Sequence, residues 1–322
     1  MEELTTDIVI AGYGFAGAVA AIVAHDLGAK VLIAEKMEHF GGCSMLSGGG
    51  IMCVKDPREG FAYFKEMCGG RTPDAVIRAQ VNMMASSVEF IDALCRVNGA
   101  KYALRGRPGT YPYPGREAIN SLTVREVPGF EGYPWLTPGP GMHGYKIMKV
   151  LEENISKGGI PALLSAPVKE LFVNGKSEVV GVLLQKDGTL IKVSARKGVI
   201  LACGGFEHNN WLHLQYLEGK PYYSMAPLGN TGDGIALAQQ VGASLWHMWQ
   251  VHGSYGFKYP EYQIAFRHHL SGARDPYEYR PFYFAMRWIV VDKRGRRFMN
   301  EYPPAPQDTA HRPLGLFDPD IP

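Results

Sequence analysis

The order of apolar and polar positions predicts a strand, a helix and a second strand at the start of the chain. Asp7 to Ala11 is a short apolar run of the kind that forms a buried strand. A segment rich in Ala, Val and Ile follows, and Gly28 is expected to close it as a helix cap. Lys30 to Ala34 predicts the second strand. Strands that alternate with a helix indicate a sheet of the α/β class.

Further helices are predicted where apolar residues return at steps of three and four. These segments are Phe61 to Cys68, Asp74 to Cys95 and Tyr145 to Ser156. Between the last two, Arg105 to Met142 is dense in Gly, Pro and Tyr, which predicts a long ordered loop. Loops of this kind often form the wall of a binding site.

Segments of alternating polarity later in the chain predict an antiparallel meander. Asn-Gly and Asp-Gly dipeptides, the strongest short-range signals for a hairpin, separate them. A buried strand is expected next. The alternating segments are Ala162 to Val173, Val179 to Gln185 and Leu190 to Ser194, the dipeptides are Asn174-Gly175 and Asp187-Gly188, and the buried strand is Gly198 to Ala202.

Composition favours a soluble globular protein that binds a small molecule. The 322 residues are 46% hydrophobic and 20% charged, enough for two domains with a large core. The 33 basic and 31 acidic residues form no run of one sign, so neither nucleic acid nor an anionic membrane is indicated as a partner. We expect a cytoplasmic protein, since no signal peptide and no apolar stretch of about 20 residues is visible.

The cysteines and histidines do not indicate a metal site. The five cysteines include no C-x-x-C pair, which fits reduced thiols in a cytosol. His268 and His269 are adjacent and point apart on a strand, and no H-E-x-x-H or similar spacing occurs. No metal is therefore expected.

Three glycines after the first strand stand in the spacing G-x-G-x-x-G. Gly12 allows a sharp reversal, Gly14 lets the backbone approach a pyrophosphate, and Gly17 lets the helix lie close to the sheet. The helix N-terminus offers free N–H groups to an anion. Glu35, eighteen residues after Gly17, can accept the hydroxyls of a ribose. The pattern predicts a dinucleotide cofactor, and the alternative is a glycine turn without a ligand.

Taken together, several motifs resemble one family, the flavoproteins of the fumarate reductase and 3-ketosteroid dehydrogenase type. Their order and spacing agree with the family over nearly the whole chain. The motifs are GYGFAG with Glu35, GGCSMLSGGG (41–50), VILACGGFEHN (199–209), NTGDGIALAQQVGA (230–243) and, less closely, DKRGRRFMNE (292–301).

The resemblance implies an α/β fold with a Rossmann-like FAD-binding domain, an antiparallel β-meander insertion and a partial α+β capping domain. The FAD-binding domain would cover residues 1–245, with a helical and loop insertion at about 57–142, and the capping domain residues 246–322. Family members continue well past this length. A fragment, or a natural subunit whose remaining part is a second chain, is therefore expected.

The same resemblance implies noncovalent FAD, because Cys43 stands where members with covalently attached FAD have a histidine. Asp233 would close around the cofactor from the fourth motif, although that position also suits a plain helix cap. The residues implied to bind FAD are Gly12, Gly14, Ala16, Gly17, Glu35, Lys36, Gly42, Cys43, Ser44, Ser47, Gly48, Gly49, Gly50, Val168, Ala202, Gly204 and Asp233.

For the reaction, the resemblance implies hydride transfer at flavin N5 that forms or reduces a C=C bond conjugated to a carbonyl. The arginine that donates a proton in fumarate-reducing members is absent from its place after Glu301, and prolines follow instead. Ketosteroid dehydrogenases use tyrosines on the ketone, so an apolar or cyclic ketone is the first expected substrate. The candidate catalytic residues are Tyr111, Tyr113, His252 and Tyr255.

Two other functions stay open. One is a fumarate or urocanate reductase-like enzyme. The other is a noncatalytic flavin-binding subunit that relays electrons. Sequence alone does not give the direction of the reaction or the electron acceptor.

Overall fold

The computed structural model describes residues 2–106, 108–109, 111–139, 141–217, 222–249, 256–267 and 294–297. The chain forms two compact units, Met1–Gly204 and Gly205–Pro322, which are treated separately below. The domain boundary expected near residue 245 stays a prediction. The candidate catalytic residues His252 and Tyr255 lie outside the described residues.

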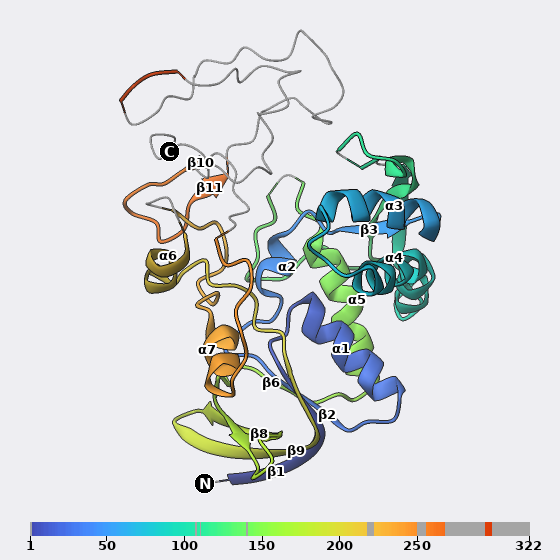
Figure 1. The fold of residues 1–322 in the computed structure, drawn as a ribbon. Helices are drawn as coiled ribbons and strands as arrows, with labels where there is room; N and C mark the ends of the chain where they lie inside the picture. The colour runs from blue at the N-terminus through green and yellow to red at the C-terminus, as the bar shows by residue number, and fades with distance from the viewer. Residues whose placement is uncertain are drawn as a thin grey trace. The chain divides into compact units, whose positions relative to one another are not determined.

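Six strands form the main sheet of the first unit (Figure 1). They are β1 (Glu2–Ala11), β2 (Val31–Ala34), β6 (Ala162–Leu163), β7 (Val168–Val173), β8 (Val179–Lys186) and β9 (Thr189–Leu201). Their order across the sheet is β6-β2-β1-β9-β8-β7. The first four in this order run parallel, while β8 and β7 continue from β9 as an antiparallel meander. The predicted α/β class and the meander are both confirmed.

β9 belongs to both halves of this sheet. Its first part pairs antiparallel with β8, and its length from Ile191 to Leu201 pairs parallel with β1. The sequence predicted two separate strands here, because the charged residues between Ser194 and Gly198 interrupt the apolar pattern. A register shift, Thr6 to Ile8 on β1 against Ala195 to Gly198 on β9, absorbs the interruption. β1 is also longer than predicted, since its first residues pair with this same strand.

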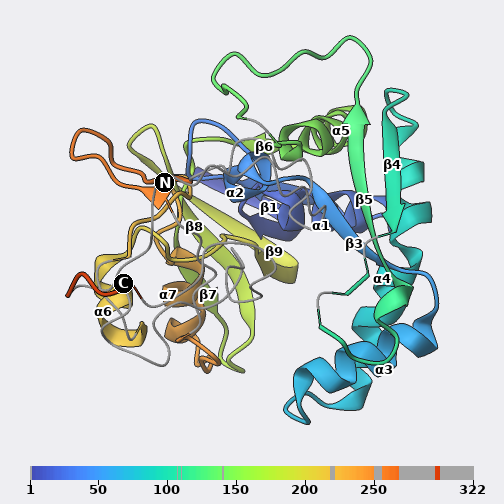
Figure 2. The same cartoon turned by 90° about the horizontal axis from the view of Figure 1, so that it is seen from above.

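Two helices cover the parallel strands of the first unit (Figures 1 and 2). α1 (Phe15–Asp26) contacts β1 and β2, and α5 (Gly144–Lys157) packs beside α1. Their inward residues share one core cluster with the strands, in which Ile10, Ile33 and Met148 are completely buried. Burying each such side chain contributes about 1.5–3 kcal/mol. The apolar spacing that predicted these helices therefore marks the face that packs on the sheet.

α1 ends as the sequence predicted, at Gly28. The Gly28 N–H donates to the His25 carbonyl and the Ala29 N–H to the Ala24 carbonyl, at 2.8 and 3.0 Å. Gly28 has a φ of +84°, which favours glycine. This pair of hydrogen bonds is the Schellman pattern that ends many helices.

A second sheet of three antiparallel strands lies in the first unit. Its strands are β3 (Gly50–Val54), β4 (Lys101–Gly106) and β5 (Ile119–Glu126), with β5 in the middle. Three helices pack near it: α3 (Pro57–Cys68), α4 (Asp74–Cys95) and the short 3-10 helix η1 (Arg116–Ala118). The loop predicted for residues 105–142 is wrong over β5. Glycines and prolines on both sides concealed a strand that is stabilised by partners on each edge.

The two predicted hairpins differ in their turns. Asp187 and Gly188 form a two-residue turn between β8 and β9 with φ values of +49° and +77°, as Asp-Gly predicts. Between β7 and β8 the connection is longer. There the Asn174 carboxamide oxygen accepts hydrogen bonds from the N–H groups of Lys176 and Glu178, and Ser177 has the positive φ.

The second unit contains short elements among its described residues. They are α6 (Asn210–Tyr216), α7 (Asp233–Gln240), β10 (Gly256–Phe257) and β11 (Phe266–Arg267). Asp233 begins α7, and its carboxylate accepts a hydrogen bond from the Thr231 hydroxyl at 2.5 Å. In the described part of the chain, no helix is long and apolar enough to cross a bilayer, and no group of His, Cys, Asp and Glu could hold a metal ion.

Candidate cofactor site

The turn after β1 has room only for glycine at two positions. A Cβ added to Gly12, whose φ is +108°, would lie 2.3 Å from the Ala202 carbonyl oxygen. A Cβ added to Gly17 would lie 2.0 Å from the Gly12 carbonyl oxygen. Both obstacles are backbone atoms and cannot rotate away. Glycine at 12 and 17 thus lets the turn, α1 and the end of β9 approach one another closely.

The N-terminus of α1 faces this turn without a charged cap. Gly14 is the N-cap residue and has no side chain that could cap the helix, and no acidic residue stands in its first turn. The first helical N–H, that of Phe15, donates to the Ser44 hydroxyl oxygen at 3.0 Å. The partial positive charge of a helix N-terminus favours an anion such as a pyrophosphate.

Glu35 stands at the carboxyl end of β2 and is held from two sides. One carboxylate oxygen accepts from the Tyr13 N–H at 2.8 Å, and the other accepts from the Met37 N–H at 2.9 Å. Each oxygen keeps a further lone pair, so the carboxylate can still accept a ribose hydroxyl. Lys36 follows directly, half-buried like Glu35.

Tyr13 joins the glycine turn to the second glycine segment. Its N–H reaches Glu35, its carbonyl accepts from the Gly41 N–H at 2.8 Å, and its ring stacks on Phe40 with centroids 4.9 Å apart. Burial, with a smaller effect of Glu152, raises the pKa of the phenol above its usual value. Tyr13 is therefore a neutral anchor that fixes both glycine segments against Glu35.

The second glycine segment, residues 41–50, contains the short helix α2 (Gly42–Leu46) and leads into β3. The Ser47 hydroxyl donates to the Ser44 carbonyl at 2.7 Å and accepts from the Gly49 N–H at 3.1 Å. The Ser47 carbonyl accepts from the N–H groups of His143 and Gly144. The Ser47 side chain therefore shapes the segment, and the Ser47 backbone carbonyl ties it to the start of α5.

Several predicted cofactor residues of this segment present an exposed edge. The residues Gly42, Cys43, Gly48 and Gly50 are exposed, whereas Gly49 is buried. A Cβ on Gly49, which has a φ of +66°, would lie 2.7 Å from the carbonyl carbon of His143. An edge with small side chains lets a flat ring lie against backbone, which fits the isoalloxazine of a flavin.

The other predicted cofactor residues fall into two groups. The Ala202 N–H donates to the Ala11 carbonyl at 2.7 Å, so Ala202 and Gly204 follow β9 to the glycine turn. Val168 begins β7, two residues after Ala166, whose N–H donates to the Glu35 backbone carbonyl at 2.8 Å. Asp233 belongs to the second unit.

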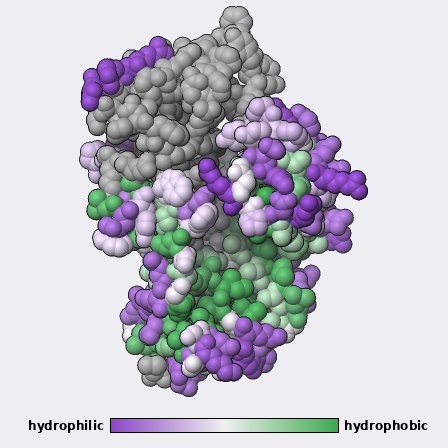
Figure 3. Space-filling model, in the orientation of Figure 1, coloured by the Kyte–Doolittle hydropathy of each residue, from purple (hydrophilic) through white to green (hydrophobic). Residues whose placement is uncertain are grey.

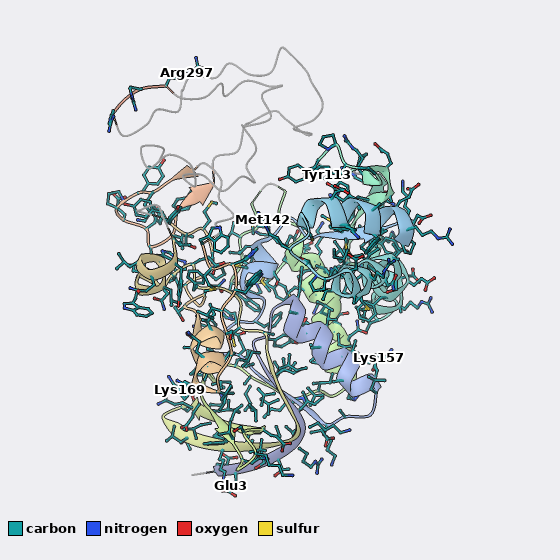
Figure 4. The ribbon with its side chains drawn as sticks, viewed as in Figure 1. Glu3, Tyr113, Met142, Lys157, Lys169 and Arg297 are labelled. Atoms are coloured by element: carbon teal, nitrogen blue, oxygen red, sulfur yellow. The ribbon has the colours of Figure 1, made fainter. Side chains whose placement is uncertain are left out.

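The candidate catalytic residues Tyr111 and Tyr113 lie on a loop that is held on α3. The Tyr111 N–H donates to the Tyr63 hydroxyl at 3.2 Å, and the two candidate rings stack with centroids 5.9 Å apart. Their side chains are 45% and 37% exposed. Figure 4 labels Tyr113 beside α3. The structure brings these tyrosines to each other, and their catalytic role stays a prediction.

A cavity of about 620 Å³ lies elsewhere in the first unit. It is lined by residues at the start of β1 and β2 and by the C-terminal ends of α1 and α5, including Leu4, Val31 and Ile160. None of the predicted site residues is among its described lining. Apolar residues gather over α1 and the adjoining strands in the lower half of Figure 3.

Sequence reasoning missed one pair of polar residues beside the glycine segment. Arg125 on β5 and His143 before α5 are joined by Nη1 and Nε2 at 2.9 Å. Burial lowers the pKa of His143, and the charges of Arg125, Lys146 and Arg105 lower it further. The two residues are eighteen positions apart in a stretch predicted as a loop, so no sequence signal joined them.

A parallel sheet with a G-x-G-x-x-G turn, a helix N-terminus without an acidic residue and an acid at the end of the second strand defines a dinucleotide-binding protein. Within this class, the family model described as FAD binding domain matches residues 7–310, and the chain belongs to this family. FAD is therefore its dinucleotide. The resemblance seen in the sequence is confirmed.

Known relatives are oxidoreductases. The chain is 28% identical over 312 residues to NADH:fumarate oxidoreductase of Klebsiella pneumoniae, covering 92% of this chain and 29% of that protein. It is 26% identical over 285 residues to 3-oxosteroid 1-dehydrogenase of Comamonas testosteroni, covering 68% and 50%. The chain thus spans half or less of the length of these relatives.

Solved structures share the fold. A 3-ketosteroid delta1-dehydrogenase from Sterolibacterium denitrificans, in complex with 1,4-androstadiene-3,17-dione, matches with a TM-score of 0.70 at 22% identity, covering 81% of this chain and 59% of that one. A flavocytochrome c3 fumarate reductase in its open conformation matches with a TM-score of 0.64 at 24% identity, covering 83% and 45%.

Proposed function

We propose that this protein is an FAD-dependent oxidoreductase that forms or reduces a C=C bond conjugated to a carbonyl group. The observation that carries the proposal is the pair of glycine segments fixed to Glu35 through Tyr13, in a chain of the FAD binding domain family. Bound FAD supplies the atom, N5, that accepts or donates the hydride.

The chain's own residues would bind and orient this cofactor without a covalent bond. Gly12, Gly14, Ala16 and Gly17 would receive the pyrophosphate and Glu35 with Lys36 the adenosine ribose. A second set would lie along the riboflavin and the ring. That set is Gly42, Cys43, Ser44, Ser47, Gly48, Gly49, Gly50, Val168, Ala202, Gly204 and Asp233.

For the reacting group, tyrosines that polarise a carbonyl would suit a ketone. Tyr111, Tyr113, Tyr255 and His252 are the proposed catalytic residues, and a phenol can act as a base only where neighbours lower its pKa. An apolar or cyclic ketone is one substrate class, as in the ketosteroid dehydrogenase relatives. A carboxylic acid substrate, as in the fumarate reductase relatives, is the other.

The proposal also covers the location of the protein in the cell and its partners. An odd number of cysteines without a C-x-x-C pair supports a cytoplasmic location. Because the chain spans half or less of the length of the Klebsiella and Comamonas relatives, we also propose that further polypeptide, in the same or a second chain, completes the active site.

Anaerobic spectroscopy of the protein with bound FAD tests the proposed function. A saturated cyclic 3-ketone should bleach the oxidised flavin band, or a conjugated enone or enoate should restore the band after reduction. A flavin spectrum that is inert to all of them would instead favour the noncatalytic flavin-binding subunit.

A further inference from the structure

The hydrogen bond between Arg125 and His143 determines the protonation state and the tautomer of the histidine. A guanidinium can only donate hydrogen bonds, so at 2.9 Å the Nε2 of His143 must accept from Nη1 of Arg125. His143 is therefore neutral and carries its proton on Nδ1. Its lowered pKa agrees with this assignment.

This arrangement leaves two buried donors without an acceptor. Nδ1 of His143 and Nε of Arg125 are both buried, and neither has a hydrogen-bond partner among the described residues. A buried donor that stays unpaired is costly, so native proteins rarely keep one without a partner such as a ligand, an ion or a water.

The surroundings of the pair are positively charged. Lys146 donates from Nζ to the Arg125 carbonyl oxygen at 2.6 Å, and Arg105 is near enough to lower the pKa of both Arg125 and His143. In the described part of the chain, no carboxylate forms an ion pair with Arg105 or Arg125. Positive charge without a carboxylate partner favours an anion at this place.

The pair also adjoins the glycine segment. Thr123 pairs with Gly50 across β5 and β3, and Arg125 follows two residues later on β5, at an irregularity in the pairing of β5 with β4. The His143 N–H donates to the Ser47 carbonyl, and the His143 backbone packs on Gly49. Arg125 and His143 therefore border, from two different elements, the backbone edge proposed to lie along the flavin.

We propose that Arg125 and His143 form a binding site for the carboxylate group of a small substrate. The proposal rests on the proposed function and narrows its substrate class to α,β-unsaturated carboxylic acids. The planar guanidinium of Arg125 can offer two parallel donors to the two oxygens of a carboxylate. Neutral His143 holds the guanidinium through Nη1 and can donate from Nδ1.

The test compares ligands that differ only in charge. Calorimetric titration of the protein with bound FAD uses but-2-enoate, its neutral isostere but-2-enamide, and cyclohex-2-enone, all at constant ionic strength. The acid should bind about tenfold or more tightly than the amide, as expected for a charge-assisted contact. Arg125→Gln should remove this difference without loss of FAD. Arg78→Gln, a change at an exposed arginine on α4, is the matched control.

Two further variants guard against a folding defect. If Arg125→Gln has a lower melting temperature or loses FAD, Arg125→Lys serves in its place. Lysine keeps the positive charge but lacks the two parallel donors of the guanidinium, so this variant should bind the acid more weakly than the parent protein. Arg105→Gln, at an exposed residue, should weaken acid binding by a smaller factor. The proposed carboxylate site would be wrong if the acid and the amide bound equally or if the enone bound more tightly than the acid. It would also be wrong if none of the changes at Arg125 and Arg105 altered the affinity for the acid.

The site and the proposed function fail in different ways. If but-2-enoate binds through Arg125 but never reoxidises reduced flavin, the site stands and the reaction is wrong. If the enone reoxidises the flavin while acid and amide bind equally, the reaction stands and the carboxylate site is wrong.

Discussion

At the turn after β1, distances to backbone atoms decide which residues fit. Gly17 would place a Cβ 2.0 Å from the Gly12 carbonyl oxygen, whereas Gly14 would place one 3.2 Å from the movable Ser44 hydroxyl. The two glycines stand three positions apart, yet only Gly17 is needed for the turn to close. Gly14 instead keeps the approach to the helix N-terminus open.

Alanine at these two positions should therefore have different effects. Gly17→Ala should destabilise the protein by about 1–3 kcal/mol, since overpacking typically costs this much and the obstacle is a fixed backbone atom. Gly14→Ala should fold with little loss of stability but bind FAD about tenfold more weakly, because its methyl group stands where the pyrophosphate approaches. Chemical denaturation and FAD titration measure the two effects. Gly132→Ala, with no atom within 4 Å of its Cβ, is the control.

His143 gives the stability a pH dependence of known sign. Its folded-state pKa lies below the usual histidine value of 6.5, mainly because the ring is buried and secondarily because Arg125, Lys146 and Arg105 are near. Below about pH 6.5 the unfolded chain therefore binds more protons than the folded one, and the free energy of unfolding falls as the pH falls.

Replacing His143 should make the free energy of unfolding depend less on pH. Between about pH 7.5 and about pH 5.5, the parent protein should lose more unfolding free energy than His143→Gln, as measured by urea denaturation. Taking the difference removes the contribution of the other titrating groups that both proteins share. Parallel profiles for the two proteins would contradict the assigned state of His143.

Among the elements, the paired strands β4 and β5 differ in burial, since β5 in the middle of the second sheet is mostly buried and β4 at its edge is mostly exposed. Leu122 on β5 is 0% exposed, while its cross-strand neighbour Leu104 on β4 is 48% exposed. Leu122→Ala should lower the free energy of unfolding by about 2–5 kcal/mol, and Leu104→Ala by less than about 1 kcal/mol. Thermal melts of the two variants check this. Equal losses would contradict the difference in burial between Leu122 and Leu104.

The sequence predicted those elements whose periodicity is long or whose turn is specific. α4 runs from Asp74 to Cys95 as its apolar spacing indicated, and Asp187-Gly188 forms the expected turn. β5 could not be predicted, because it pairs with strands far away in the chain while its neighbours in sequence are loop formers. A local sequence pattern reflects only residues that are adjacent in the chain, whereas β5 is stabilised by its pairing with β3 and β4.

The residues of the candidate site likewise include some that the sequence predicted and some that it did not. Gly12, Gly17 and Glu35 were predictable because a single strand-turn-helix unit sets their spacing. The hydroxyls of Ser44 and Ser47 turned out to bond to backbone groups. Arg125 and His143 meet only because β5 and α5 pack against the same glycine segment, and this long-range contact leaves no periodic trace in the sequence.

At the scale of the whole molecule, noncovalent attachment of FAD has a direct test. The chain has an exposed cysteine, Cys43, in the glycine segment, where covalently flavinylated members of the family have a histidine. Acid precipitation of the yellow protein should leave all of the FAD in the supernatant. The protein in the pellet should have the mass of the unmodified chain, about 35.5 kDa for these 322 residues. A pellet that keeps the flavin would show a covalent bond.

The placement of β1 beside β9 also affects how the protein is made. Glu2 pairs with Ile191 and Ala11 with Leu201, so β1 leaves the ribosome well before β9, the partner that is synthesised almost two hundred residues later. Until then its unpaired edge can bind other nascent chains or a chaperone. Contacts this distant in sequence slow folding. A chain released from the ribosome before residue 190 would therefore lack β9, and its glycine turn could not close although the G-x-G-x-x-G motif is present.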